Sequence, residues 1–194
     1  MPTLRRAVLA LPLLLCAVCA HADTLTLDFE GLDDGSIVTT GLSSDVEFAN
    51  TIALVAGGAL LNEIDFPPAS GLGVVAPDGG MGSITITFAR PVVRLAGRFT
   101  YFESLALAAF DSSGEVASAQ SLFTENLATG ANAPNELIEL VYAAGFSSVT
   151  IGSASTPFTL DDLELEFAAV TQVPEPAVTL LLVAGVATAV RRRR

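Results

Sequence analysis

The sequence predicts an all-β fold, a single antiparallel β-sandwich of the jelly-roll kind, lying between two hydrophobic terminal segments. Apolar and polar residues alternate with a period of two through most of residues 24–167, which is typical of half-buried strands. Turn-forming runs such as Asp33-Asp34-Gly35 separate these strands. No stretch between the terminal segments shows the apolar period of an amphipathic helix.

The predicted strands are short and follow one another closely. The two clearest are residues 24–30 and 83–88, where every second residue is apolar. Further strand-like segments are residues 46–48, 51–56, 92–95, 98–102, 105–110, 115–122, 137–142, 147–152 and 158–167. Roughly ten strands without an intervening helix favour a sandwich over an α/β fold.

One stretch does not follow the strand rhythm. Residues 57–82 contain seven glycines and three prolines. Loops of this length are uncommon in compact domains and are often functional. The simpler interpretation is an ordinary connection that carries a short strand near residues 73–76, and a functional loop is the alternative.

The first 22 residues have the features of a secretory signal peptide. They comprise a basic start, an apolar stretch and a small-x-small end: Arg5-Arg6, residues 7–19, and Ala20-His21-Ala22. We predict export by the general secretion machinery and cleavage after Ala22, so that Asp23 becomes the first residue of the mature protein.

The last 22 residues join three parts in a fixed order: Val173-Pro174-Glu175-Pro176, the apolar residues 177–190, and Arg191-Arg192-Arg193-Arg194. As a helix, the apolar part spans about 21 Å, against about 30 Å of bilayer hydrocarbon. Local thinning and arginine snorkelling accommodate such a short span. The arginines should stay on the cytoplasmic side, which leaves the preceding domain outside. A buried C-terminal helix is disfavoured, because it has no polar face to place beside four arginines.

These three parts resemble the PEP-CTERM sorting signal of Gram-negative bacteria. In that family, the segment is recognised by exosortase, a membrane protease-transpeptidase, and its carriers are exported, often to the cell surface or the biofilm matrix. The resemblance covers about a tenth of the chain. It implies a precursor that is anchored transiently in the inner membrane, is processed by exosortase, and then reaches the cell surface or the extracellular space.

The domain of residues 23–172 lacks most of the side chains on which enzymes depend. Cys16, Cys19 and His21 all lie in the predicted signal peptide, and the chain contains no lysine or tryptophan. Catalytic triads, Cys-His pairs, Schiff-base lysines and zinc sites built on imidazole or thiolate are therefore excluded. We predict a protein that is not an enzyme. A glycoside hydrolase, which needs only two carboxylates, is the remaining catalytic alternative.

The same domain is strongly acidic. Twenty Asp and Glu residues face only three arginines, Arg90, Arg94 and Arg98, which gives a net charge of −17. Such a surface repels nucleic acid, so no nucleic-acid partner is expected. We predict that Arg98 is an ion-pair partner rather than part of a site.

Two carboxylate clusters form the best candidate for a cation site. Asp28 and Glu30 share the face of an early strand, and the alternation of residues 158–167 slips at Asp161-Asp162, which predicts a β-bulge. Because jelly rolls often pair their first and last strands, Glu30 and Asp161 are expected to meet. Oxygen ligands suit Ca²⁺, so a structural calcium is the one candidate cofactor; solvated turn carboxylates are the alternative. Carbohydrate-binding jelly rolls, which the domain resembles in pattern, also carry calcium in this region.

The sequence therefore predicts a non-catalytic, surface- or matrix-directed protein. A carbohydrate-binding module is the alternative, with extracellular polysaccharide as its partner. The absence of tryptophan weakens that alternative, since sugar rings stack on aromatic platforms and the domain offers only two tyrosines.

Overall fold

The computed structural model describes residues 22–153 and 157–169, which form one compact unit. Nine strands and no helix occur in these residues, so the predicted all-β class is confirmed. The strands are β1 (Thr24–Leu27), β2 (Val46–Ala49), β3 (Thr51–Val55), β4 (Gly73–Pro77), β5 (Gly82–Tyr101), β6 (Ala106–Asp111), β7 (Gly114–Gln120), β8 (Glu136–Ser153) and β9 (Phe158–Phe167).

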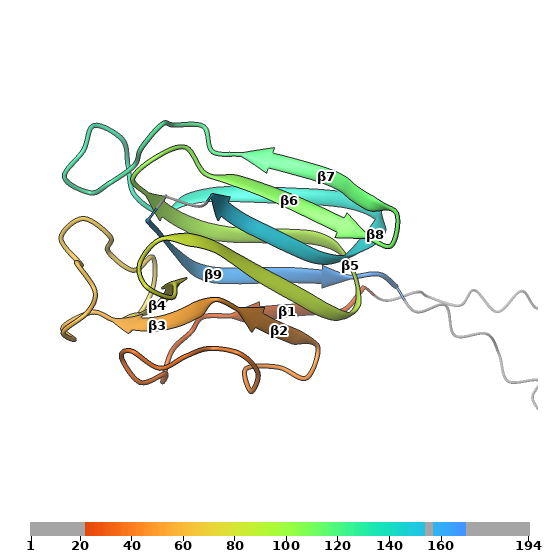
Figure 1. Ribbon diagram of the computed structural model, residues 1–194, viewed down its shortest axis with the longest axis horizontal. Coiled ribbons are helices and arrows are strands. Elements are labelled where there is room, and N and C mark those ends of the chain that lie inside the picture. Colours follow the sequence, from red (N-terminus) through yellow and green to blue (C-terminus); the bar gives the residue numbers. More distant parts are fainter. Residues whose placement is uncertain (1–21, 154–156, 170–194) are drawn as a thin grey trace, which may run out of the picture. The chain divides into compact units, whose positions relative to one another are not determined.

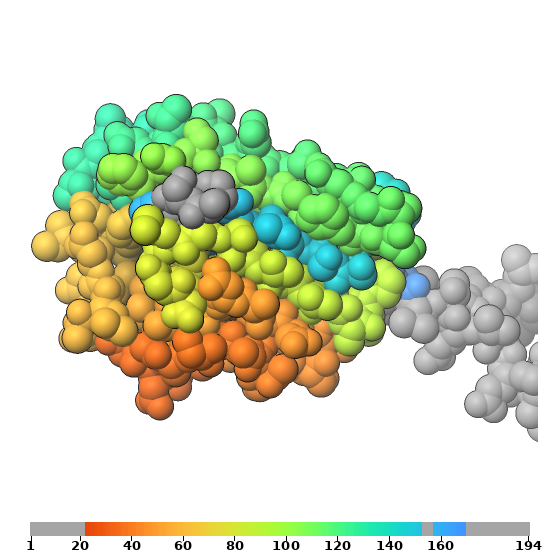
Figure 2. Space-filling view, in the orientation of Figure 1, coloured from red at the N-terminus to blue at the C-terminus, as the bar shows by residue number. Residues whose placement is uncertain are grey.

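All strand pairs are antiparallel and belong to one connected network. The long strands β5 and β8 fold this network into two layers, because each strand takes part in both (Figure 1). The first layer has the order β2, β5, β8, β6, β7. Figure 2 shows its outer surface as adjacent bands of orange (β2), yellow-green (β5), blue (β8) and green (β6 and β7). In the second layer, β9 lies between β5 on one side and β1 and β4 on the other, with β3 beyond β4 and β8 beyond β5.

The continuity of β5 and β8 corrects the sequence prediction, which divided them into five shorter strands. On β5 the register with β8 is interrupted between Thr87 and Val92, and Pro91 lies in this gap. Because the ladder is already broken there, the missing N–H of proline costs no strand hydrogen bond. Opposite it, Gly145 has φ of 85°, and a Cβ at this position would lie 2.8 Å from Pro91 Cβ. The two long strands therefore cross between layers at a proline and a glycine.

The core lies between the two layers and follows the predicted alternation. Ile84 and Ile86 from the first layer and Leu163 and Leu165 from the second are each fully buried. Burying a side chain of this size contributes about 1.5–3 kcal/mol. Two phenylalanine pairs pack edge to face within this core, with ring centroids 5.9–6.0 Å apart.

The first and last strands pair, as predicted, and this brings the two ends of the domain together. Thr24 lies opposite Glu166, and the N–H of Phe167 donates a hydrogen bond to the carbonyl of Asp23 at 2.9 Å. We call this the terminal end of the domain. The other end, here called the loop end, carries the β3–β4 loop (amber) and the β7–β8 loop (teal) in Figure 1.

Candidate functional site

The predicted bulge in β9 is confirmed. Along the β5–β9 pair, Ala96 lies opposite Glu164, whereas Arg98 lies opposite Asp161, so β9 has one extra residue between the two pairs. Asp162 has φ of 47°, a left-handed conformation that is uncommon outside glycine. The bulge turns both aspartates of this pair towards the β3–β4 loop.

Asp161 holds this loop from a buried position beneath it. Its side chain is buried, and Oδ2 accepts hydrogen bonds from the N–H groups of Ala69 at 2.7 Å and Ser70 at 3.0 Å. Oδ1 accepts from the N–H of Asp162 at 2.7 Å. Burial raises the pKa of Asp161, and the three backbone N–H groups act in the opposite direction without reversing the shift.

Glu30 holds the same stretch of the loop. Its Oε1 accepts hydrogen bonds from the N–H groups of Leu72 at 2.8 Å and Gly73 at 2.7 Å. Asp162 adds a bond from the Ser70 hydroxyl at 2.8 Å. Glu30 and Asp161 thus bind neighbouring parts of residues 69–73, here called the clamped segment. In the part of the chain that the structure describes, Asp28 bonds within its own turn, where it accepts the N–H of Glu30 at 3.2 Å.

The remainder of the β3–β4 loop is also fixed. Asp34 accepts the N–H groups of Val55 and Ala59 where the loop begins. Asp65 contacts the β7–β8 loop, because its carbonyl accepts the N–H of Ala128 at 3.0 Å and its carboxylate accepts the Thr129 hydroxyl. The short strand predicted near residues 73–76 is confirmed as β4, which is buried along its length.

The four carboxylates predicted to bind calcium are therefore engaged in anchoring the chain. Both oxygens of Asp161 and one oxygen of Glu30 accept backbone N–H groups. Within the described ranges, no group of three or more Asp, Glu, His or Cys side chains is arranged to hold a metal ion. These contacts do not test calcium binding, which stays a prediction.

The sequence-predicted sorting residues fall outside the described residues, with one exception. Residues 1–21 and 170–194, which contain Ala20, Val173-Pro174-Glu175-Pro176 and Arg191–Arg194, are not described. Ala22 is the first described residue, and it is exposed. Among the described residues, no helix is long and apolar enough to cross a membrane.

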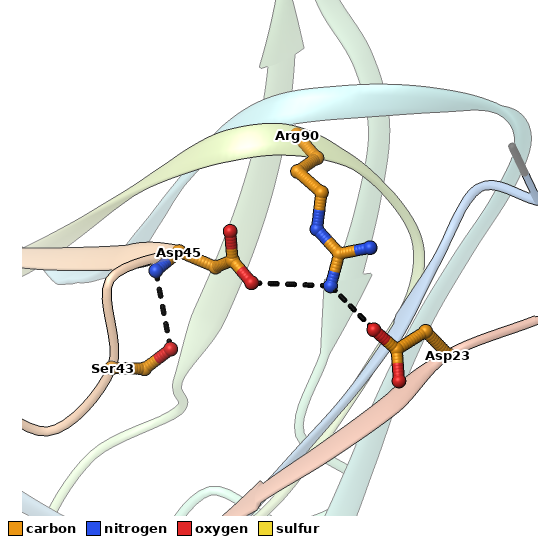
Figure 3. A network of polar contacts seen from close by, with 4 residues as sticks. All are labelled: Asp23, Ser43, Asp45 and Arg90. Atoms are coloured by element: carbon orange, nitrogen blue, oxygen red, sulfur yellow. Dashed lines mark hydrogen bonds and ion pairs between the residues drawn. The ribbon is translucent and has the colours of Figure 1, made fainter.

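A charged cluster at the terminal end was not identified from the sequence. Arg90 Nη2 lies 2.7 Å from Asp23 Oδ2 and 3.1 Å from Asp45 Oδ2, as Figure 3 shows. The guanidinium also stacks over the Phe167 ring, 3.9 Å from its centroid. The hydrogen bond with Asp23 raises the pKa of Arg90 above its ordinary value, although burial opposes this. We call these four residues the Arg90 cluster.

The other two arginines lie further along β5. Arg94 forms ion pairs with Glu139 and Glu164 on the neighbouring strands. The predicted ion pair of Arg98 is wrong for the described part of the chain, where Arg98 donates to the carbonyl of Asn135 at 3.4 Å.

A groove runs beside the Arg90 cluster, at the edge formed by β2. Its volume is about 480 Å³, within the range of small-molecule sites. Its lining combines hydroxyl groups and two carboxylates with apolar side chains such as Phe88. The lining residues are Thr40, Gly41, Ser43, Ser44, Asp45, Val46, Glu47, Thr87, Phe88 and Ala89.

No protein-family model and no curated protein matches the chain. Among solved structures, the chain is similar to TmCBM61, which was determined in complex with β-1,4-galactotriose. The TM-score is 0.32 at 16% sequence identity, over 63% of this chain and 88% of the other. A likeness at this level carries no argument about function.

Proposed function

We propose that the protein is exported and directed to the cell surface or extracellular matrix, has no catalytic activity of its own, and is sorted through residues 173–194. The terminal segments support the proposal, because a signal-peptide pattern and a short apolar segment with four arginines frame an acidic domain. The domain between them lacks cysteine, histidine and lysine, which removes most catalytic chemistry.

The observation that best supports this proposal is the pairing of β1 with β9. It places Asp23 beside Phe167, so both hydrophobic terminal segments continue from the same end of the domain. A precursor whose two terminal segments are both in the membrane can therefore fold, because β1 and β9 pair without either terminus having to cross the domain.

The sorting motif follows the folded domain closely. Ala168 still donates its N–H to the carbonyl of Pro91, and only four residues, 169–172, separate it from Val173. Fully extended, four residues span about 13–14 Å. Proline fixes φ and keeps the preceding residue out of the helical region, so Pro174-Glu175-Pro176 is suited to enter a protease cleft as an extended segment.

Replacing Pro174, Glu175 and Pro176 by alanine tests this function in the native host. Full-length precursor should accumulate in the inner membrane, which intact-mass analysis of cell fractions would detect. Alanine at Thr171 and Gln172, just outside the motif, is the matched control and should leave processing unchanged. Normal processing of the motif variant would contradict the proposal.

A polysaccharide-binding role is the second candidate, and the groove beside β2 favours it. Hydroxyl and carboxylate groups of the kind that line it exchange hydrogen bonds with sugar hydroxyls, and Glu47 is exposed at this edge. The processed protein from its native host should then bind a neutral glycan on an array. Glu47→Ala should weaken that binding at least about tenfold, as expected for loss of a charged hydrogen bond. Glu115→Ala, at an exposed position on β7, should not.

An array without bound glycan would remove this second candidate and leave the matrix role.

A further inference from the structure

We propose that the Arg90 cluster holds Asp23, the residue after the predicted signal-peptide cleavage site, against the sandwich, so that the Ala22–Asp23 bond is hydrolysed only while β1 is undocked from β9. The inference rests on the proposed function, which requires cleavage at this bond. It assigns to Arg90 a role in the order of export events: removal of the signal peptide comes first, and closure of the sandwich comes second.

Asp23 is fixed through its backbone and its side chain. Its carbonyl accepts the N–H of Phe167 at 2.9 Å, and its carboxylate lies 2.7 Å from Arg90 Nη2. The next residue, Thr24, already pairs with Glu166 in the β1–β9 ladder. The residue that follows the scissile bond is thus part of the folded domain.

Arg90 is placed to hold Asp23 against the folded domain. Asp45 holds the same Nη2 at 3.1 Å (Figure 3). The guanidinium also covers the ring of Phe167, the last residue of β9. Arg90 therefore joins the first mature residue to the end of the last strand and to the start of β2. Withdrawing Asp23 from the domain breaks the ion pair and the backbone hydrogen bond together.

Proteases bind their substrates as extended segments several residues long. Hydrolysis adds one water across the amide: the hydroxyl joins the Ala22 carbonyl carbon, and the hydrogen joins the Asp23 nitrogen. An active site that reaches this bond needs the residues on both sides free of other strands. In the closed sandwich, the residues that follow the bond, from Asp23 to Leu27, are paired with β9.

Synthesis order gives the peptidase time to act. The partner strand of β1 is completed only at Phe167, the last residue of β9, 144 positions after Asp23. At roughly 5–20 residues per second, this interval lasts about 7–30 s, during which β1 has no partner. During this interval the peptidase acts on an extended chain. If β1 pairs with β9 before cleavage, the folded precursor protects the bond.

The test uses the full-length chain, folded in detergent micelles and treated with purified bacterial signal peptidase. Three proteins are compared: the wild type, Arg90→Gln, and the matched control Arg94→Gln, which removes a different ion-paired arginine of the same strand. A synthetic peptide of residues 12–32 reports the rate for the unpaired sequence. Intact mass locates the cleaved bond in each case.

The wild type should be cleaved after Ala22 at least tenfold more slowly than the peptide. Arg90→Gln should be cleaved about three to ten times faster than the wild type, as expected for loss of a surface ion pair and a cation–π contact. Arg94→Gln should match the wild type. Asp45→Ala, which removes one support of Arg90 but leaves the Asp23 contact, should lie in between. Cooperative urea unfolding of each variant shows that faster cleavage is not due to a general loss of fold.

Equal rates for the peptide and the folded wild type would overturn the inference, as would equal rates for Arg90→Gln and Arg94→Gln. A peptide that is not cut after Ala22 would instead overturn the signal-peptide assignment, and the inference with it. The two failures are therefore distinguishable.

Discussion

Asp161 places a carboxylate in a buried position beneath the β3–β4 loop, where a charge is costly unless it is hydrogen-bonded. Its acceptor oxygens are matched to three backbone N–H groups, two of them from a loop about 90 residues away in sequence. A single buried side chain thus replaces the strand pairing that the β3–β4 loop lacks at this point. The role of Asp161 is to fix the loop to the bulge of β9.

Removing this carboxylate should destabilise the domain. Asp161→Ala leaves three backbone N–H groups without their partner, and we expect a loss of about 1–3 kcal/mol in the free energy of unfolding. Urea denaturation in EDTA measures this effect without calcium. Asp33→Ala, at an exposed turn, is the control and should change stability by less than about 0.5 kcal/mol. Equal stabilities would contradict the anchoring role.

The calcium hypothesis predicts a separate effect. Added Ca²⁺ should raise the melting temperature of the wild type, and Asp161→Ala should abolish the rise. A melting temperature that is independent of calcium would remove the hypothesis and leave the anchoring role intact.

The raised pKa of Asp161 sets the direction of a pH effect. Because the pKa in the folded state lies above the ordinary value of 3.8, the folded protein binds this proton more tightly than the unfolded chain does. The stabilising contribution is complete below the ordinary value and is lost as pH rises through the folded-state value. The stability difference between the wild type and Asp161→Ala should therefore grow as pH falls from about 7 to about 4. A difference that shrinks on acidification would indicate a lowered pKa instead.

At the scale of elements, the clamped segment depends on a glycine as well as on carboxylates. Gly71 has φ of 48°, and a Cβ there would lie 2.2 Å from Glu30 Oε1. A side chain at this position conflicts both with the backbone conformation and with the group that holds Leu72 and Gly73. The loop approaches Glu30 this closely only because residue 71 is glycine.

A double-mutant cycle separates these two conflicts. Gly79 also has a positive φ, of 81°, but nothing lies within 4 Å of its Cβ position, so Gly79→Ala should cost about 1–2 kcal/mol from backbone strain alone. Gly71→Ala should cost at least about 1 kcal/mol more, because the methyl group displaces Glu30. In a Glu30→Ala background this excess should disappear. An excess that persists there would show that Glu30 is not its cause.

Which elements the sequence predicts depends on how local their signals are. The alternation around Ile84 and Ile86 predicted a strand, and the phase slip at Asp161 predicted a bulge. Both features depend on the pattern of residues that are adjacent in sequence. The crossing at Pro91 was missed, since proline normally ends a strand and its tolerance here depends on Gly145, which is distant in sequence.

The contacts of the candidate site are likewise long-range. Asp161 and Glu30 were expected to converge, yet their partners are backbone amides, which carry no sequence signal. The Arg90 cluster joins residues from four separate segments of the domain. The charge pattern of the sequence does not indicate which of the 20 carboxylates form ion pairs with Arg90.

At the scale of the whole molecule, the last strand completes the domain. β9 is paired with β5 on one side and with β1 and β4 on the other, and its inward side chains are buried. Without it, the second layer loses the strand that joins its two halves. The domain therefore folds as a unit only when nearly all of it has been synthesised.

Truncation tests this dependence. A chain that ends at Pro157 should show no cooperative urea transition, because Leu160, Leu163 and Leu165 are missing from the core. A chain that ends at Gln172 keeps β9 and should unfold cooperatively. Both chains begin at Met1, so they differ only in the C-terminal part. A cooperative transition in the shorter chain would show that the remaining strands suffice.

The side-by-side placement of the two ends also determines how the domain responds to mechanical load. Antiparallel hydrogen bonds run perpendicular to their strands. Tension applied between Asp23 and Phe167 opens the β1–β9 ladder one pair at a time, so little force is needed. Tension between the tail and the loop end instead pulls β9 along its own axis and strains all its hydrogen bonds together. A cell that held this protein by its tail and loaded it through the loop end would use the stronger direction.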